Sequence, residues 1–175
     1  MKIEVVQEFL SQRGFKEVKK REVKKRKGVL IGVRQSGHTP EYIYIKMFET
    51  KFELNTVRDF VWSNFVIDSS GQILEKTSNN VICQLVIICL SFQNSHVKEF
   101  REASPNIQII RSDFFNVNIT KIVPHHQKVL QFEFSKKGLP VIKEDDPICV
   151  FYFFKKGDLI RVIRKNGEVC YRVVK

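Results

Sequence analysis

The chain has 175 residues, 43% of them hydrophobic, so it can bury one large core or two small ones. Its net charge of +11 comes from both ends: residues 1–34 hold 11 basic side chains against 4 acidic ones, residues 117–175 hold 12 against 6, and residues 35–116 hold 7 against 9. Glu4 and Glu8 interrupt the segment that a signal peptide would need, and no apolar run has the length of a membrane span. These features argue against a secreted or membrane-spanning protein and favour an intracellular one that contacts nucleic acid or an acidic protein surface.

The first predicted element is an amphipathic helix. Its apolar side chains recur at helical spacing and are Ile3, Val6, Phe9 and Leu10. Gly14 can adopt a positive φ and is expected to end this helix. Two strands are then expected at residues 29–33 and 42–48, around a turn at residues 35–40.

A basic run lies between the first helix and the first strand, since residues 13–27 hold nine lysines and arginines. Two interpretations stay open. The run is either a solvated helix extension or strand-edge loop, or a patch that follows nucleic-acid phosphates without reading bases. In the second case the phosphate contacts would come from Lys19, Lys20, Lys24, Lys25, Arg26 and Lys27.

A second helix is expected at residues 55–67, before a polar loop at residues 68–80. The apolar side chains of this helix are Leu54, Val57, Val61 and Phe65. Residues 81–92 are typical of a buried strand.

A short helix, capped by Asn94 or Ser95 and ended by Pro105, leads to a further strand at residues 107–110. A strand, a helix and a strand in this order predict a βαβ unit with parallel pairing. We therefore expect an α/β N-terminal domain with a mixed sheet over residues 1–115. The boundary to a second domain, residues 116–175, is expected within residues 113–116.

Within the second domain, turn signals occur at Leu139-Pro140 and Asp146-Pro147. Residues 148–154 are apolar and aromatic and are predicted to form a strand, and residues 155–158 form a tight connection in which Gly157 can take a positive φ. The domain is thus expected to be a small α+β unit, mostly antiparallel.

A hairpin is predicted at the end of the chain, with Asn166-Gly167 as a two-residue type I′ turn. The register that such a turn fixes places Arg161 directly opposite Arg172, on an otherwise apolar face. Like charges in opposed positions destabilise an isolated sheet. Either both guanidinium groups spread into solvent, or a carboxylate or phosphate of a partner lies over them. The second alternative would make this face a protein-docking surface.

Catalytic and metal-binding patterns are missing from the sequence. The cysteines Cys83, Cys89, Cys149 and Cys170 lie in apolar runs without Cys-x-x-Cys spacing, as buried thiols in a reducing compartment do. The pair His125-His126 has no third ligand nearby in the sequence. We expect no metal, no cofactor and no small-molecule substrate.

Two acidic patterns bear on catalysis. Residues 144–146 (Glu-Asp-Asp) are interpreted as a solvated turn in which Asp146 caps the following segment. The strings Glu17-Val18-Lys19 and Glu22-Val23-Lys24 resemble part of a nuclease motif, but that motif needs a preceding aspartate and the first aspartate of the chain is Asp59. A divergent nuclease is therefore disfavoured.

One ordered set of short motifs in the C-terminal third resembles a known family. The set consists of Asn118-Ile119-Thr120, Val123-Pro124-His125-His126, Leu139-Pro140, Asp146-Pro147, residues 155–164 (KKGDLIRVIR) and Tyr171-Arg172. In this order it resembles the assembly domain of the fifth, shared subunit of eukaryotic nuclear RNA polymerases and of its archaeal counterpart. Residues 9–15 and the order of the following elements are similar, more weakly, to the N-terminal jaw domain of the eukaryotic form.

The chain departs from the family pattern at four places. The segment at residues 127–138 is shorter than the helical segment of the family, and the turn at Asn166-Gly167 is trimmed. Phe154 replaces the glycine before the basic pair, and Val141 replaces an arginine. These differences suggest a divergent, compact form, such as a large DNA virus or a reduced eukaryote encodes.

The resemblance implies a non-catalytic subunit of a multisubunit DNA-directed RNA polymerase. The C-terminal domain would dock on the largest subunit, and the N-terminal domain would lie beside downstream DNA, which it contacts without sequence specificity. The expected location is the nucleus for a cellular protein, and the viral factory or virion for a viral one. The docking residues that the resemblance implies are Pro124, His126, Pro140, Asp146, Pro147, Lys156, Gly157, Arg161, Arg164, Tyr171 and Arg172. The alternative, based on the charge, is a free-standing basic nucleic-acid-binding module.

Overall fold

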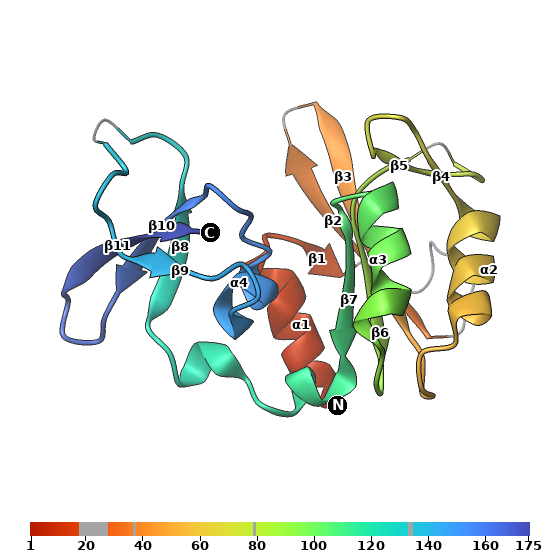
Figure 1. Cartoon of the computed structure of the whole chain (residues 1–175), viewed down its shortest axis with the longest axis horizontal. Coiled ribbons are helices and arrows are strands. Elements are labelled where there is room, and N and C mark those ends of the chain that lie inside the picture. Colours follow the sequence, from red (N-terminus) through yellow and green to blue (C-terminus); the bar gives the residue numbers. More distant parts are fainter. Residues whose placement is uncertain (18–27, 37, 79, 133–134) are drawn as a thin grey trace. The chain divides into compact units, whose positions relative to one another are not determined.

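A computed structural model describes residues 1–17, 28–36, 38–78, 80–132 and 135–175 (Figure 1). The chain divides into two compact units, Met1–Asn116 and Val117–Lys175. Each unit has its own sheet and its own buried cluster of apolar side chains. The helices of the described ranges contain at most 11 residues, and none of them is long and apolar enough to cross a membrane.

The N-terminal unit is built on a seven-stranded mixed sheet (Figure 1). Its strands run in the order β1-β2-β3-β6-β5-β4, with β7 also paired to β6. The strands are β1 (Lys16–Glu17), β2 (Val29–Ser36), β3 (Thr39–Met47), β4 (Phe65–Ile67), β5 (Ile73–Glu75), β6 (Val81–Cys89) and β7 (Ile107–Arg111). The β3–β6 and β6–β7 pairs are parallel and the others are antiparallel. The predicted mixed sheet with a βαβ unit is confirmed, with α3 (Asn94–Ala103) as the crossover between β6 and β7.

Two helices pack against one face of this sheet. Val57 and Val61 of α2 (Leu54–Asn64) and Phe100 of α3 belong to the buried cluster that also contains Ile87 of β6. Alternation along a strand directs successive side chains to opposite faces, so Ile31 joins this cluster while Gly32 faces the other way.

The first helix packs against the opposite face. In α1 (Ile3–Gln12) the buried side chains are Val5, Val6, Phe9 and Leu10, whereas Ile3 is 47% exposed, so the buried face is rotated slightly from the predicted one. Helix α1 lies close to β2 at Gly32, where an added Cβ would lie 3.1 Å from Leu10 Cδ2 and 2.8 Å from Ile43 Cγ2. Gly14 has a φ of +80° just after α1, which confirms the predicted end of the helix.

The second predicted helix and the loop after it differ from the prediction. Helix α2 ends at Asn64, because Phe65 is extended and begins β4. The predicted loop at residues 68–80 contains the strand β5. A three-residue strand is too short for periodicity to reveal it. In β5, Glu75 is 7% exposed and accepts a hydrogen bond from the Tyr44 hydroxyl at 2.7 Å.

The C-terminal unit is built on a four-stranded sheet in the order β8-β10-β11-β9. The strands are β8 (His125–Val129), β9 (Val141–Ile142), β10 (Leu159–Ile163) and β11 (Val169–Val174). Among the strands of the described residues in this unit, only the β9–β11 pair is parallel, so the predicted small α+β, mostly antiparallel unit is confirmed. Its core contains Ile160, Val162 and Val174 from the sheet and Ile148 and Cys149 from a short helix.

The strand predicted at residues 148–154 is wrong, because this segment forms the helix α4 (Pro147–Tyr152). The Asp146 carboxylate accepts a hydrogen bond from the Ile148 backbone N–H at 2.9 Å, and Pro147 occupies the first turn. A short apolar run cannot by itself distinguish a strand from a buried helix, and Asp-Pro is the signal that favours the helix. Phe153 ends α4 with a φ of 61°, in the left-handed conformation.

The predicted hairpin register is also wrong, by one residue. Arg164 and Glu168 close a three-residue loop: the Arg164 N–H donates to the Glu168 carbonyl and the Gly167 N–H donates to the Arg164 carbonyl. Gly167 has a φ of +85°, as in a type I turn followed by a bulge. Consequently Arg161 pairs with Tyr171, and Ile160 pairs with Arg172. The two arginines are not opposed and lie on opposite faces of the sheet.

Candidate functional site

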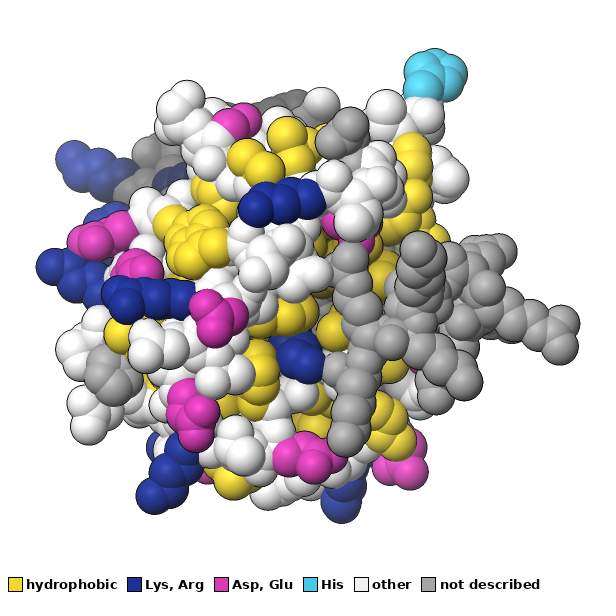
Figure 2. All heavy atoms as spheres, turned by 90° about the vertical axis from the view of Figure 1, so that its right-hand side faces the viewer, with side chains coloured by type: hydrophobic (Ala, Val, Ile, Leu, Met, Phe, Trp, Pro, Cys, Tyr) yellow, Lys and Arg dark blue, Asp and Glu magenta, His cyan; other side chains and the backbone are white. Residues whose placement is uncertain are grey.

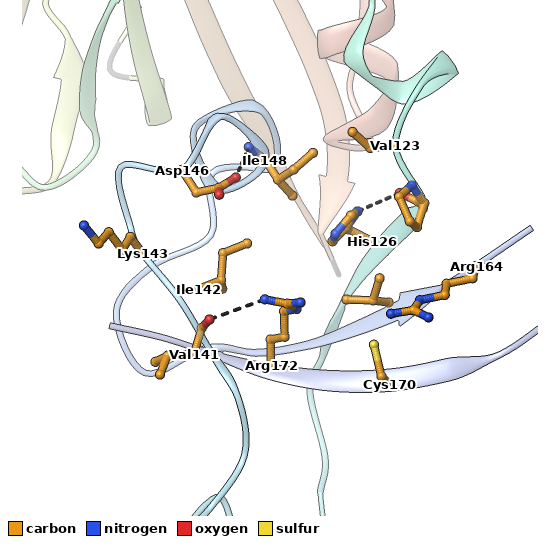
Figure 3. Close-up of a pocket in the computed structure, with 12 residues that line it drawn as sticks. Val123, His126, Val141, Ile142, Lys143, Asp146, Ile148, Arg164, Cys170 and Arg172 are labelled. Atoms are coloured by element: carbon orange, nitrogen blue, oxygen red, sulfur yellow. Dashed lines mark hydrogen bonds between the residues drawn. The ribbon is translucent and has the colours of Figure 1, made fainter.

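A pocket of about 440 Å³ opens on one face of the C-terminal sheet (Figure 3). It is bounded by β8, β9, β10, β11 and the N-terminal end of α4. The residues that line it are Val123, Pro124, His126, Val141, Ile142, Lys143, Asp146, Ile148, Val162, Arg164, Cys170 and Arg172. All of them belong to the C-terminal unit.

The strand register explains why these side chains meet. Val162 pairs with His126 on one side and with Cys170 on the other, so the three side chains lie in a row on one face. Arg172, two residues beyond Cys170, lies on the same face. Figure 3 shows its side chain directed from β11 into the pocket.

The floor of the pocket is apolar. Ile142, Ile148 and Val162 are 8%, 8% and 4% exposed and belong to the core of the unit. Cys170 packs against the same core and is partly buried. The pocket floor is therefore a small part of the hydrophobic core that the pocket leaves accessible.

The rim is mainly basic. Arg172 donates one long hydrogen bond, 3.5 Å, from Nη1 to the Val141 carbonyl. Arg164 forms an exposed ion pair of 3.0 Å with Glu168 across the hairpin loop. Lys143 is the third cation of the lining. The Asp146 carboxylate, the acidic group of the lining, caps α4.

His126 lies between the floor and the rim. Its Nδ1 is 2.6 Å from the Pro124 carbonyl oxygen. Since a carbonyl only accepts hydrogen bonds, Nδ1 carries the proton and Nε2 is the acceptor of the neutral ring. Burial lowers the pKa of His126 below its usual value, and the positive charge of Arg172 acts in the same direction, against the Asp146 carboxylate and the Pro124 carbonyl.

The lowered pKa predicts a pH dependence for the C-terminal unit. The unfolded chain binds a proton at His126 near its usual pKa, whereas the folded chain binds it only at lower pH. The stability that neutral His126 contributes is therefore present above the unfolded pKa and is lost as the pH falls towards the folded one. Amide hydrogen exchange in β10 should accelerate, after correction for intrinsic rates, between about pH 7.5 and about pH 5.5. His126→Gln should reduce this acceleration, and an equal acceleration in both proteins would contradict the assignment.

Five of the eleven docking residues implied by the resemblance line this pocket: Pro124, His126, Asp146, Arg164 and Arg172. The other six do not. Pro147 begins α4, and the Pro140 carbonyl accepts from the Val173 N–H beside β9. Lys156 and Gly157 form the turn before β10, where Gly157 has a φ of +89°.

Arg161 and Tyr171 lie on the other face of the sheet. Tyr171 contacts the ring of Phe132, with 5.6 Å between the centroids. The Nε of Arg161 is buried and has no hydrogen-bond partner within the described ranges. The predicted opposition of the two arginines is therefore wrong, and Arg172 and Arg161 belong to different surfaces.

Sequence reasoning missed the apolar floor. Ile142, Ile148, Val162 and Cys170 look like ordinary core positions in the sequence, and they line the pocket only because the register aligns them with His126 and Arg172. The correct three-residue loop could have been inferred from the glycine at position 167, since a single Gly after a type I turn is also a recognised hairpin signal.

The six candidate phosphate contacts of the basic run, from Lys19 to Lys27, lie outside the described residues. On the face shown in Figure 2, described basic and acidic side chains are interspersed. This mixture agrees with the near balance of charge in residues 35–116. The described part of this face thus presents no single-sign surface of the kind that follows a phosphate backbone.

Among the described residues, no group of three or more His, Cys, Asp or Glu side chains could hold a metal ion. Three of the cysteines also lack the lowered pKa of a reactive thiol. Burial raises the pKa of Cys83 and of Cys89 to about 11, and that of Cys149 to about 12. A thiol with so high a pKa is mainly protonated at neutral pH, and the nucleophilic thiolate form is scarce.

Comparison with known proteins bears on the same segment. The family model described as "RNA polymerase Rpb5, C-terminal domain" matches residues 115–174, which include every residue of the pocket. The chain is 51% identical, over 178 positions and the full length of both chains, to uncharacterized protein 092R of Invertebrate iridescent virus 3. It is 26% identical over 194 positions to a protein of Invertebrate iridescent virus 6 that is provisionally named DNA-directed RNA polymerase subunit 454R, with 98% of this chain and 97% of that protein covered. Residues 115–174 therefore form an Rpb5 C-terminal domain, the domain that the ordered C-terminal motifs resemble.

Proposed function

We propose that the chain is a non-catalytic subunit of a multisubunit DNA-directed RNA polymerase. Its C-terminal unit docks on the largest subunit, and its N-terminal unit lies beside downstream DNA. The observation that carries this proposal is the pocket, which brings Pro124, His126, Asp146, Arg164 and Arg172 together within the segment that matches the family.

The chemistry of the pocket suits docking. An apolar floor with arginines at its rim is typical of the anchor sites of protein interfaces, where apolar burial contributes affinity and charge contributes orientation. The sheet holds these side chains on paired strands, so the surface is formed before a partner arrives. A preorganised surface of this kind reduces the entropy cost of association.

Co-purification from the source cells tests the proposal. The chain, tagged at its N-terminus and expressed at its native level, should recover two very large polymerase subunits in stoichiometric amount. The recovered complex should extend RNA on a DNA template, and the tagged chain alone should not. Recovery of the chain without these subunits would refute the proposal.

A free-standing nucleic-acid-binding module is the second candidate, and the net charge of +11 favours it. It predicts that the purified chain binds DNA or RNA as tightly as any complex does, with an affinity that falls steeply with salt. Fluorescence anisotropy with a labelled duplex between about 50 and about 200 mM salt measures this dependence. The polymerase proposal predicts only weak binding by the isolated chain, because the described part of the face in Figure 2 carries charges of both signs.

A further inference from the structure

We infer that the pocket of the C-terminal unit receives an extended segment of its partner that presents an aliphatic side chain followed by a carboxylate. The inference rests on the proposed docking function and names the chemistry of the segment that docks. It follows from how apolar surface and charge are arranged within the pocket.

The floor favours an aliphatic side chain. Ile142, Ile148 and Val162 are almost fully buried, and partly buried Cys170 lies beside them, so the pocket ends on apolar groups that continue into the core. Burying a Leu or Ile side chain against this floor would remove its apolar surface from water, which favours binding. The volume of about 440 Å³ exceeds what one such side chain fills, which leaves space for the neighbouring residues of an extended segment.

The rim favours a carboxylate. Arg172 is the cation nearest the centre of the pocket in Figure 3, and its guanidinium group is held within the unit by the long 3.5 Å contact with the Val141 carbonyl. A guanidinium group can bind a carboxylate through two parallel hydrogen bonds. Lys143 and Arg164 add positive charge on the same rim, whereas the Asp146 carboxylate is engaged by the Ile148 N–H.

Neutral His126 adds an acceptor. Its Nδ1–H donates to the Pro124 carbonyl, so Nε2 can accept a hydrogen bond from a backbone N–H of the segment. Burial favours this neutral form by lowering the pKa of the ring. The pocket thus offers an apolar floor, a cationic rim and one acceptor, which together match a peptide.

A nucleic-acid phosphate fits the same surface less well. A phosphodiester would place its charge near Arg172, but it carries no apolar group to cover Ile142 and Val162. The apolar floor would then stay in contact with water and would contribute nothing to binding. The carboxylate-bearing peptide is therefore the occupant that the structure favours.

The test uses the full-length ¹⁵N-labelled chain and short peptides followed by NMR. Acetyl-Gly-Leu-Glu-Gly-amide should shift the amide signals of Ile142, Cys170 and Arg172. The peptide with Gln in place of Glu, and the one with Ser in place of Leu, should each bind about tenfold more weakly, since each lacks one of the two recognised groups. Arg172→Gln should abolish the preference for Glu over Gln, and Lys165→Gln, a change in the exposed hairpin loop, should leave it intact.

Three outcomes would overturn the inference. Equal binding of the Glu and Gln peptides would show that the pocket does not recognise a carboxylate. Equal binding of the Leu and Ser peptides would show that it does not recognise an aliphatic side chain. If inorganic phosphate shifts the amide signals of the same three residues at a lower concentration than the peptide does, the pocket is a general anion site and not a peptide site. Co-purification with the polymerase tests the proposed function separately, so a polymerase subunit that fails the peptide test would still dock, but by other chemistry.

Discussion

Replacing Arg13 with methionine is expected to lower the free energy of unfolding of the N-terminal unit by about 2–3 kcal/mol. Arg13 is only 6% exposed, and its guanidinium group donates to Gln84 Oε1 at 2.6 Å and to Gln108 Oε1 at 2.8 Å. Its Cζ lies 3.7 Å from the centroid of the Phe9 ring. Methionine fills part of the volume but leaves two amide oxygens without these donors. Urea unfolding, followed by the fluorescence of the single tryptophan, Trp62, measures the change.

The cost should come from the glutamine acceptors and not from the loss of charge. Burial lowers the pKa of Arg13 well below its usual value, which means that its charged form is poorly solvated in the folded protein. Changing Arg13 to Met together with Gln84→Leu and Gln108→Leu should therefore recover at least half of the lost stability. Arg111→Met, at a side chain that is 58% exposed, should change stability by less than about 0.5 kcal/mol. A triple variant as unstable as the single one would contradict this account.

The parts of the fold that could be predicted from the sequence are those with long, regular patterns. The first helix, the buried strand β6 and the parallel β6–β7 pair follow from helical spacing, a long apolar run and the order of elements. The mixed sheet of the N-terminal unit, the mostly antiparallel C-terminal unit and the family were confirmed on that basis. Short elements carry too few residues for a period, which is why the patterns do not reveal β5 and α4.

The candidate site could be predicted only in part, because it depends on register. Motifs in the sequence indicate His126, Asp146 and Arg172, and the structure places all three on one pocket. A one-residue shift of the hairpin exchanges the two faces of a strand, and this shift separates Arg172 from Arg161. The division of these side chains between the two faces of the sheet therefore depends on the conformation of the loop at residues 165–167, which short motifs do not determine.

Replacing Arg172 with glutamate is expected to weaken incorporation into the polymerase by about 100-fold, or about 2.7 kcal/mol. The change reverses the charge at the centre of the basic rim and places a carboxylate in the same pocket lining as Asp146. A partner carboxylate would then meet a like charge where it had met a guanidinium group. Competition between differently tagged wild-type and variant chains, co-expressed in the same cells, gives the ratio of the two in the purified complex.

Two further variants decide whether the pocket or the general charge of the chain is responsible. Lys165→Glu makes the same change of net charge in the exposed hairpin loop and does not alter the pocket lining, so it should be incorporated within about threefold of wild type. Arg172→Gln removes the charge without adding a carboxylate, and should fall between wild type and Arg172→Glu. Because Arg161 lies on the opposite face and pairs with Tyr171, its replacement should act independently of Arg172, so that the two free-energy changes add. Equal losses for Lys165→Glu and Arg172→Glu would show that net charge, and not the pocket, governs assembly.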